Sequence, residues 1–206
     1  MTSPPTSPSV SPAEQARPAR IGGTLFRYRS FLPVPLVAVA LLAPGHLSLW
    51  GWVGGGALIL LGEAIRLAGV AAAGTVTRRR SRNVKRLVTY GAFAWSRNPL
   101  YNGNFLIWLG FAIASGVWWF PIVAVLLFAV EYRYIVAYEE GVLESIFGET
   151  YLAYKARTPR WIPRPPRERE AGEFHWAEAF KSETSTFLQY VALVAALVIK
   201  ARLTNR

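Results

Sequence analysis

Long apolar segments are the feature of this chain that most constrains its fold. Residues 47–73, 100–118 and 120–138 carry few charges, and each is about as long as a helix that crosses a membrane. Two further apolar segments cover residues 25–43 and 187–199. A soluble domain of 206 residues, 52% of them hydrophobic, cannot bury so many long apolar helices in one core. We therefore predict a protein that crosses the membrane several times.

The fold class that follows is all-α: a polytopic membrane bundle of four or five transmembrane helices. Residues 1–24 are expected to form a disordered tail, because this segment is rich in Pro, Ser and Thr and has too few apolar residues to form a core. Residues 25–73 would hold the N-terminal transmembrane helices, and residues 74–165 a central region with a two-helix transmembrane hairpin. Residues 166–206 would hold a linker and the last transmembrane helix. Because the apolar segment 187–199 is short, an interfacial helix is the alternative there.

Positive charge is unevenly distributed along the chain, whose formal net charge is +11. Between residues 74 and 98 there is no acidic residue, and the basic residues are Arg78, Arg79, Arg80, Arg82, Lys85, Arg86 and Arg97. The short turns near Pro44 and Trp119 carry neither Lys nor Arg. Because basic loops stay in the cytoplasm, we place the N-terminus and residues 74–98 and 139–185 there. The distribution of positive charge thus indicates the membrane topology and contact with membrane lipids, and a nucleic acid partner is not expected.

Composition disfavours several kinds of site. The chain has no Cys, so disulfides, thiolate metal sites and Cys nucleophiles are excluded. The histidines are His46 and His175, which leave little for zinc, and no metal site is predicted. The glycines within residues 51–56 lie inside an apolar segment, where they favour close helix packing over a dinucleotide-binding loop.

Two pairs of charged residues fall inside apolar segments. Glu63 and Arg66 are three residues apart, and ionisable residues within a membrane often mark a functional site. The alternative is a structural ion pair along one helix, and both interpretations stay open. Glu131 and Arg133 are two residues apart and do not face each other on a helix, so at least one of them needs another partner.

Residues 87–103 combine a helix start with nearby positive charge. The Asn-Pro pair at residues 98–99 ends one element and allows a new helix to begin. The unpaired backbone N–H groups of that helix would lie near Lys85, Arg86 and Arg97, which suits an anion such as a carboxylate or phosphate. The alternative is a capped helix start whose basic neighbours bind lipid headgroups.

Residues 139–163 form the second informative stretch. Apolar and aromatic residues recur at three- and four-residue steps, at Leu143, Phe147, Tyr151 and Tyr154. This spacing predicts an interfacial helix that folds back over the basic loop. Glu139 and Glu140 lie at the membrane end of the fourth span, where two adjacent carboxylates are costly without a cationic partner. The basic loop is one source of that partner.

These two stretches, in this order and separated by a hairpin, resemble the isoprenylcysteine carboxyl methyltransferase and phospholipid methyltransferase family. The residues that carry the resemblance are Arg97-Asn98-Pro99-Leu100-Tyr101-Asn102-Gly103, Glu139-Glu140, Leu143, Phe147-Gly148, Tyr151, Tyr154 and Pro159. The resemblance covers residues 78–163, and the joint spacing is more specific than either motif alone. It implies a membrane methyltransferase whose catalytic region corresponds to residues 74–165.

The resemblance also implies that S-adenosylmethionine binds in a cytoplasmic pocket and that a lipophilic acceptor enters from the bilayer. The implied cofactor-binding residues are Lys85, Arg86, Leu87, Val88, Phe93, Asn98, Pro99, Leu100, Tyr101, Glu139 and Glu140. The candidate catalytic residues are Arg133 and Tyr101. A glutamate of the pair would hold the ammonium or ribose hydroxyls of the cofactor, and Lys85 or the helix start would hold its carboxylate.

The function that follows is an integral membrane methyltransferase that uses S-adenosylmethionine. We expect catalysis by positioning and exclusion of water, because a sulfonium loses a methyl group as a neutral leaving group. Where the isoprenylcysteine enzymes place a substrate-orienting arginine, this chain has Ile135, and the nearest arginine is Arg133. The acceptor (carboxylate, amine, thiol or hydroxyl) and the oligomeric state are left open. The alternatives are an NADPH-dependent sterol or lipid reductase and a non-enzymatic protein that binds anionic lipid.

Overall fold

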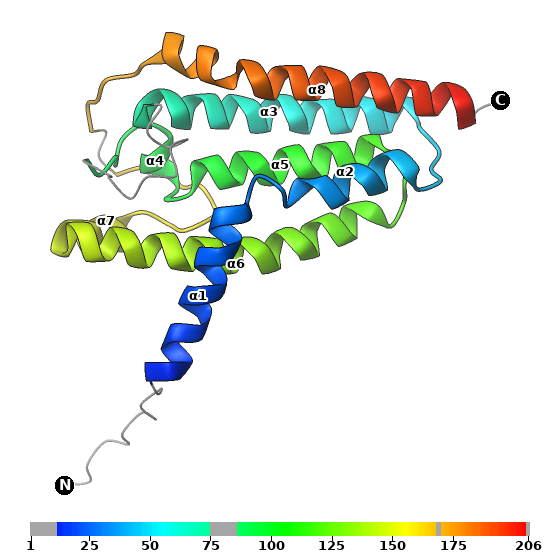
Figure 1. Cartoon of the computed structure of the whole chain (residues 1–206). Coiled ribbons are helices and arrows are strands. Elements are labelled where there is room, and N and C mark those ends of the chain that lie inside the picture. Colours follow the sequence, from blue (N-terminus) through cyan, green and yellow to red (C-terminus); the bar gives the residue numbers. More distant parts are fainter. Residues whose placement is uncertain (1–11, 75–85, 168–169, 205–206) are drawn as a thin grey trace, which may run out of the picture.

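The computed structural model describes residues 12–74, 86–167 and 170–204, and regular structure in these ranges is entirely helical. The helices are α1 (Pro12–Tyr28), α2 (Pro33–Leu42), α3 (Leu49–Ala73), α4 (Ala92–Trp95), α5 (Pro99–Ala114), α6 (Phe120–Phe147), α7 (Glu149–Arg157) and α8 (Trp176–Thr204). The long helices run side by side as a bundle (Figure 1). The predicted all-α fold class is confirmed.

Length and composition allow α3, α6 and α8 to cross a membrane. Residues 20–28 of α1 and helix α2 can together form a fourth span, which is bent by 55° at the break between them. Helix α5 has 16 residues and rises about 24 Å, less than the hydrocarbon core of a typical bilayer. By length and composition alone, the described residues thus include three or four candidate spans, where the sequence predicted four or five.

The two ends of the chain are more helical than expected. Helix α1 begins at Pro12, so residues 12–24 are helical where a disordered tail was expected, and residues 1–11 lie outside the described residues. Helix α8 begins at Trp176, well before the apolar segment 187–199. The additional polar turns make α8 long enough to cross a membrane, which favours a span over the interfacial alternative.

Helix α6 also differs from the expectation, because it continues through the glutamate pair to Phe147. The chain then turns at Gly148, whose φ of 48° lies in the left-handed region that favours glycine, and α7 follows. The interfacial helix predicted over residues 139–163 is therefore the end of a long helix and a separate short one. Glu139 and Glu140 consequently lie within the long helix α6, two turns before its end.

Glycine residues bring α3 and α5 into close contact. A Cβ atom on Gly55 would lie 2.5 Å from the Gly110 carbonyl oxygen, and one on Gly62 would lie 2.6 Å from the Gly103 oxygen. Side chains at these positions would force the two helix backbones apart. The prediction of close helix packing by the glycines of residues 51–56 is confirmed for Gly55, whereas Gly54 and Gly56 face open space.

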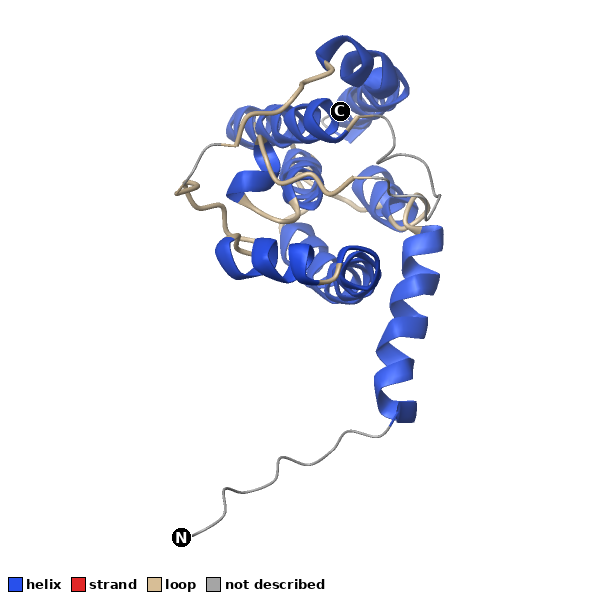
Figure 2. Cartoon of the chain, turned by 90° about the vertical axis from the view of Figure 1, so that its left-hand side faces the viewer, coloured by secondary structure: helices blue, strands red, loops and turns tan. Residues whose placement is uncertain are grey.

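The other helices surround this pair. Helix α8 lies along α3, α2 packs against α5, α6 and α8, and α6 lies on the far side of α5 from α3 (Figure 1). Helix α1 contacts α6 and then projects away from the bundle, as Figure 2 shows. At one end of the bundle the Lys200 ammonium donates a 2.7 Å hydrogen bond to the Ala40 carbonyl oxygen, which ties α8 to α2. Helices α4 and α7 lie at the other end.

Candidate active site

A cavity of about 1700 Å³ lies inside the bundle and extends from the segment that leads into α5 to Phe120 at the start of α6. Residues of α2, α3, α5, α6 and α8 line it, together with the segment that leads into α5. Its wall is partly apolar, with Leu36, Phe111 and Phe120, and partly charged. The cavity is therefore large and its wall is amphipathic, which is typical of a site for an amphipathic ligand.

Tyrosine hydroxyls hold the segment before α5 in place. The Tyr90 Oη lies 2.8 Å from the Ala72 carbonyl oxygen and 2.9 Å from that of Glu173, which joins this segment to the end of α3. The Tyr154 hydroxyl of α7 donates a 2.8 Å hydrogen bond to the Phe93 carbonyl oxygen. Burial raises the pKa of Tyr154 well above its usual value, so this hydroxyl remains a donor at every physiological pH.

Asn98 acts as a structural anchor just before α5. Its side-chain amide donates a 3.0 Å hydrogen bond to the Arg160 carbonyl oxygen, and its backbone N–H donates to the Ser96 hydroxyl. The start of α5 is therefore fixed against the segment that follows α7. The Asn98 side chain makes no cap hydrogen bond to α5, so the alternatives of a capped helix start and an anion site both stay open. Asn98 also lines the cavity.

The two adjacent glutamates have different surroundings. Glu140 is buried and accepts hydrogen bonds from Arg97, at 2.9 Å, and from Arg160. Arg97 also donates to the carbonyl oxygens of Lys155 and Thr158, each at 2.9 Å. Glu140 thus joins the basic loop, α6 and the segment after α7, and the expected basic partner of the pair is confirmed for this glutamate.

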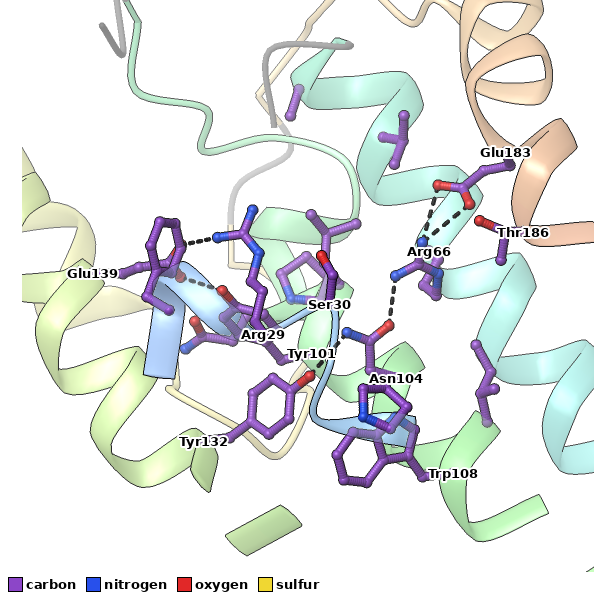
Figure 3. Close-up of a pocket in the computed structure, with 18 of the residues that line it drawn as sticks. Arg29, Ser30, Arg66, Tyr101, Asn104, Trp108, Tyr132, Glu139, Glu183 and Thr186 are labelled. Atoms are coloured by element: carbon purple, nitrogen blue, oxygen red, sulfur yellow. Dashed lines mark hydrogen bonds and ion pairs between the residues drawn. The ribbon is translucent and has the colours of Figure 1, made fainter. Parts of the chain in front are cut away.

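Glu139 points into the cavity (Figure 3). Its Oε2 accepts a 2.7 Å hydrogen bond from the Tyr101 hydroxyl, and its Oε1 lies 3.9 Å from a guanidinium nitrogen of Arg29. The Tyr101 ring meets the Tyr132 ring edge-on, with 4.8 Å between the centroids. A carboxylate and two aromatic rings therefore face one region of the cavity, a combination that can hold a cationic group.

A second polar cluster lies deeper, between α3, α5 and α8. Arg66 donates to both carboxylate oxygens of Glu183, at 3.0 and 3.1 Å, and to Glu63 at 3.3 Å. It also donates to the Asn104 side-chain oxygen (Figure 3). The Tyr190 hydroxyl donates a 2.9 Å hydrogen bond to Glu63. The predicted Glu63–Arg66 pair forms, and because Arg66 lines the cavity, the structural and functional interpretations are compatible.

Comparison with known proteins assigns the chain to a family. The family described as Phospholipid methyltransferase matches residues 50–150. Protein-S-isoprenylcysteine O-methyltransferase B of Arabidopsis thaliana is 31% identical over 137 residues, which cover 62% of this chain and 67% of that protein. This chain belongs to the isoprenylcysteine and phospholipid methyltransferase family. The prediction made from the two motifs is confirmed.

Other relatives of this methyltransferase family member cover different shares of its length. The human Protein-S-isoprenylcysteine O-methyltransferase is 33% identical over 122 residues, 55% of this chain but 42% of the human protein. The cobalt-zinc-cadmium resistance protein CzcN of Cupriavidus metallidurans is 32% identical over 176 residues, 83% of this chain and 80% of that protein. No solved structure matches the chain significantly.

Most of the residues that the family resemblance singled out lie around the one cavity. Those that line it are Arg86, Leu87, Val88, Phe93, Asn98, Pro99, Leu100, Tyr101, Glu139 and Glu140. Lys85 lies outside the described residues. Two further residues of the cavity wall, Arg29 and Glu183, were not predicted from the sequence, because no local pattern shows that their segments fold back onto this site.

Arg133, the other candidate catalytic residue of this family member, is not brought to the cavity. It is exposed on α6 and lines a separate cavity of about 530 Å³ beside Phe128 and Arg160. Ile135, at the matching position of the family's arginine, is fully buried. Residues 133 and 135 differ by about 200° around a helix, so the shift by two positions moves the arginine to another face. Arg133 and Tyr101 thus line different cavities, and a catalytic role for Arg133 stays a prediction.

Proposed function

We propose that this protein is a methyltransferase that uses S-adenosylmethionine to methylate a lipophilic acceptor at the cytoplasmic face of the membrane. The observation that carries the proposal is the convergence of the family's motif residues, from α4, α5 and α6, on a single cavity. Residues 74–165 are the proposed catalytic region. The other segments, α2, α3 and α8, complete the cavity wall.

The side chains present fit this cofactor by their chemistry. Glu139 offers a carboxylate to the ammonium or the ribose hydroxyls, and the Tyr101 hydroxyl fixes the orientation of that carboxylate. The rings of Phe93 and Tyr101 offer apolar and π surfaces to adenine or to the sulfonium. When bound, S-adenosylmethionine would supply an electrophilic methyl group with a neutral leaving group.

The cavity has room for an acceptor beside the cofactor. Ligand sites are typically about 300–1,000 Å³, and this cavity holds about 1700 Å³. Its far end, with Leu36, Phe111 and Phe120, is suited to an apolar chain. Arg66 and Asn104 line the same cavity as Glu139 and are suited to the polar part of an amphipathic acceptor (Figure 3).

The chain would promote the reaction by positioning. Tyr101 and Glu139 hold each other at the cofactor end, and the apolar side chains at the other end would disfavour water there. The Tyr101 hydroxyl donates a hydrogen bond to Glu139, so in this arrangement it acts as a positioning group rather than as a base. An acceptor that must lose a proton would have to lose it before or during entry, or to the Glu139 carboxylate.

Isothermal titration of the detergent-purified protein with S-adenosylhomocysteine tests the proposal. We expect saturable binding to the wild-type protein and loss of most of the affinity in Glu139→Gln. Folded protein that binds no S-adenosylhomocysteine would refute the proposal. Thermal stabilisation by NADPH alone would instead favour the reductase alternative.

A further inference from the structure

Arg29 lines the cavity from the N-terminal part of the chain. It lies at the break between α1 and α2, where the chain bends by 55°, and its side chain lines the cavity. Figure 3 shows it beside Glu139, although the two residues are more than a hundred positions apart in sequence. Arg29 also lies outside residues 50–150, the part that matches the family. The family match therefore says nothing about Arg29, and its contacts indicate its role.

Those contacts hold the guanidinium in place but leave a donor without an acceptor. The guanidinium carbon lies 3.9 Å from the centroid of the Phe26 ring, a cation–π contact that fixes one face. The Nη1 atom is buried and donates a hydrogen bond to no described residue. Its distance to the Glu139 Oε1 is 3.9 Å, which is an ion pair but too long for a hydrogen bond. A buried N–H without an acceptor is costly, so the site gains most from a ligand that accepts there.

Glu139 provides the opposite charge in the same region. One of its oxygens accepts from Tyr101, and the other faces Arg29 across the 3.9 Å gap. A cationic donor and an anionic acceptor thus stand side by side at the cavity wall. A ligand that carries a carboxylate and an ammonium on adjacent atoms, such as an α-amino acid, can satisfy both at once.

We propose that Arg29 is a cofactor-binding residue that holds the carboxylate of the amino-acid end of S-adenosylmethionine, while Glu139 binds the neighbouring ammonium. This inference rests on the proposed function. It is an alternative to the sequence-based choice of Lys85, which lies outside the described residues, or of the start of α5, where the Asn98 side chain is engaged with the segment after α7. The bent N-terminal segment is then part of the cofactor site and not only a membrane anchor.

Binding selectivity tests the role of Arg29 without relying on turnover. Two ligands are titrated: S-adenosylhomocysteine, and 5′-methylthioadenosine, which keeps the adenosine and thioether but lacks the amino-acid end. Arg29→Gln should weaken binding of S-adenosylhomocysteine about 10- to 100-fold and leave that of 5′-methylthioadenosine unchanged. Arg27→Gln is the matched control, because Arg27 lies two residues away, is exposed and does not line the cavity. It should change neither affinity.

The outcomes separate this inference from the proposed function. If Arg29→Gln weakens both ligands equally, or neither, Arg29 does not recognise the amino-acid end and the inference is overturned. If the wild-type protein binds neither ligand, the proposed function itself has failed. Should Arg29→Gln not fold, Arg29→Lys decides, because it keeps the charge and should still lower the preference for S-adenosylhomocysteine over 5′-methylthioadenosine.

Discussion

At the scale of single residues, neighbouring positions on α6 have unlike roles. Glu139 faces the cavity with 30% of its side chain exposed, whereas Glu140 is 6% exposed and held by two arginines. Successive helical residues differ by about 100° in direction, so one glutamate reaches the cavity and the next reaches the segment after α7. The pair should therefore not be treated as one functional unit.

Substitution of each glutamate by glutamine should separate the two roles. Glu139→Gln should lose most of the affinity for S-adenosylhomocysteine with little change in thermal stability. Glu140→Gln leaves Arg97 without its buried counter-charge and should lower the stability by about 1–3 kcal/mol. Calorimetric titration and thermal unfolding of both variants in the same detergent measure the contrast. Equal effects of the two variants on affinity and on unfolding would contradict this division.

Arg133 provides a second prediction at the residue scale. Because it lines a separate cavity, Arg133→Ala should leave the affinity for S-adenosylhomocysteine within about twofold of the wild-type value. Titration under the same conditions checks this. A tenfold loss would show that Arg133 reaches the cofactor after all.

Sequence patterns show which residues lie close together along a helix or within a motif, but they do not show contacts between distant segments. Local spacing was sufficient to place Asn98, Tyr101 and the glutamate pair near one another, because the family motifs encode that proximity. It could not show that Arg29 or Glu183 faces the same cavity, since their positions depend on how α1 and α8 fold back. It also could not separate Glu139 from Glu140, whose partners are distant in sequence.

At the scale of helices, the contact between α3 and α5 positions the whole site. Residues that lead into α5 face the cavity, and α5 is held against α3 at Gly55 and Gly62. The apolar segments predicted these helices, but the sequence did not show that α5 would end at Ala114 or that α6 would extend to Phe147. Helix ends depend on local turns such as Gly148, and apolar length alone does not specify them.

Two glycine substitutions on α3 should therefore have opposite consequences. In Gly62→Ala the new methyl group would meet the Gly103 carbonyl oxygen, and we expect a loss of about 1–3 kcal/mol in stability. In Gly56→Ala the methyl group faces open space, and stability should stay the same or rise slightly. Thermal unfolding of both variants measures the difference. A Gly62→Ala protein as stable as Gly56→Ala would show that α3 and α5 are not in close contact.

At the scale of the whole molecule, the orientation in the membrane is the main prediction. The chain has no Cys, so single introduced cysteines report their own exposure. We expect Glu149→Cys, at an exposed position of α7, to react with an impermeant thiol reagent only from the cytoplasmic side. His46→Cys, exposed at the other end of the bundle, should react only from the opposite side. The reverse pattern would invert the topology and place the cavity end outside the cell.

The ion pairs of Arg66 with Glu63 and Glu183 bear on the order in which the helices assemble during synthesis. Glu183 is the fully buried partner of Arg66, yet it is synthesised 117 residues later. Until then, α3 would enter the bilayer with an arginine whose charge is costly there. Glu63, one turn earlier on the same helix, is available from the start and gives α3 its own counter-ion. Glu63 would therefore be the partner of Arg66 during biogenesis, and Glu183 would become the second partner only when α8 packs against α3.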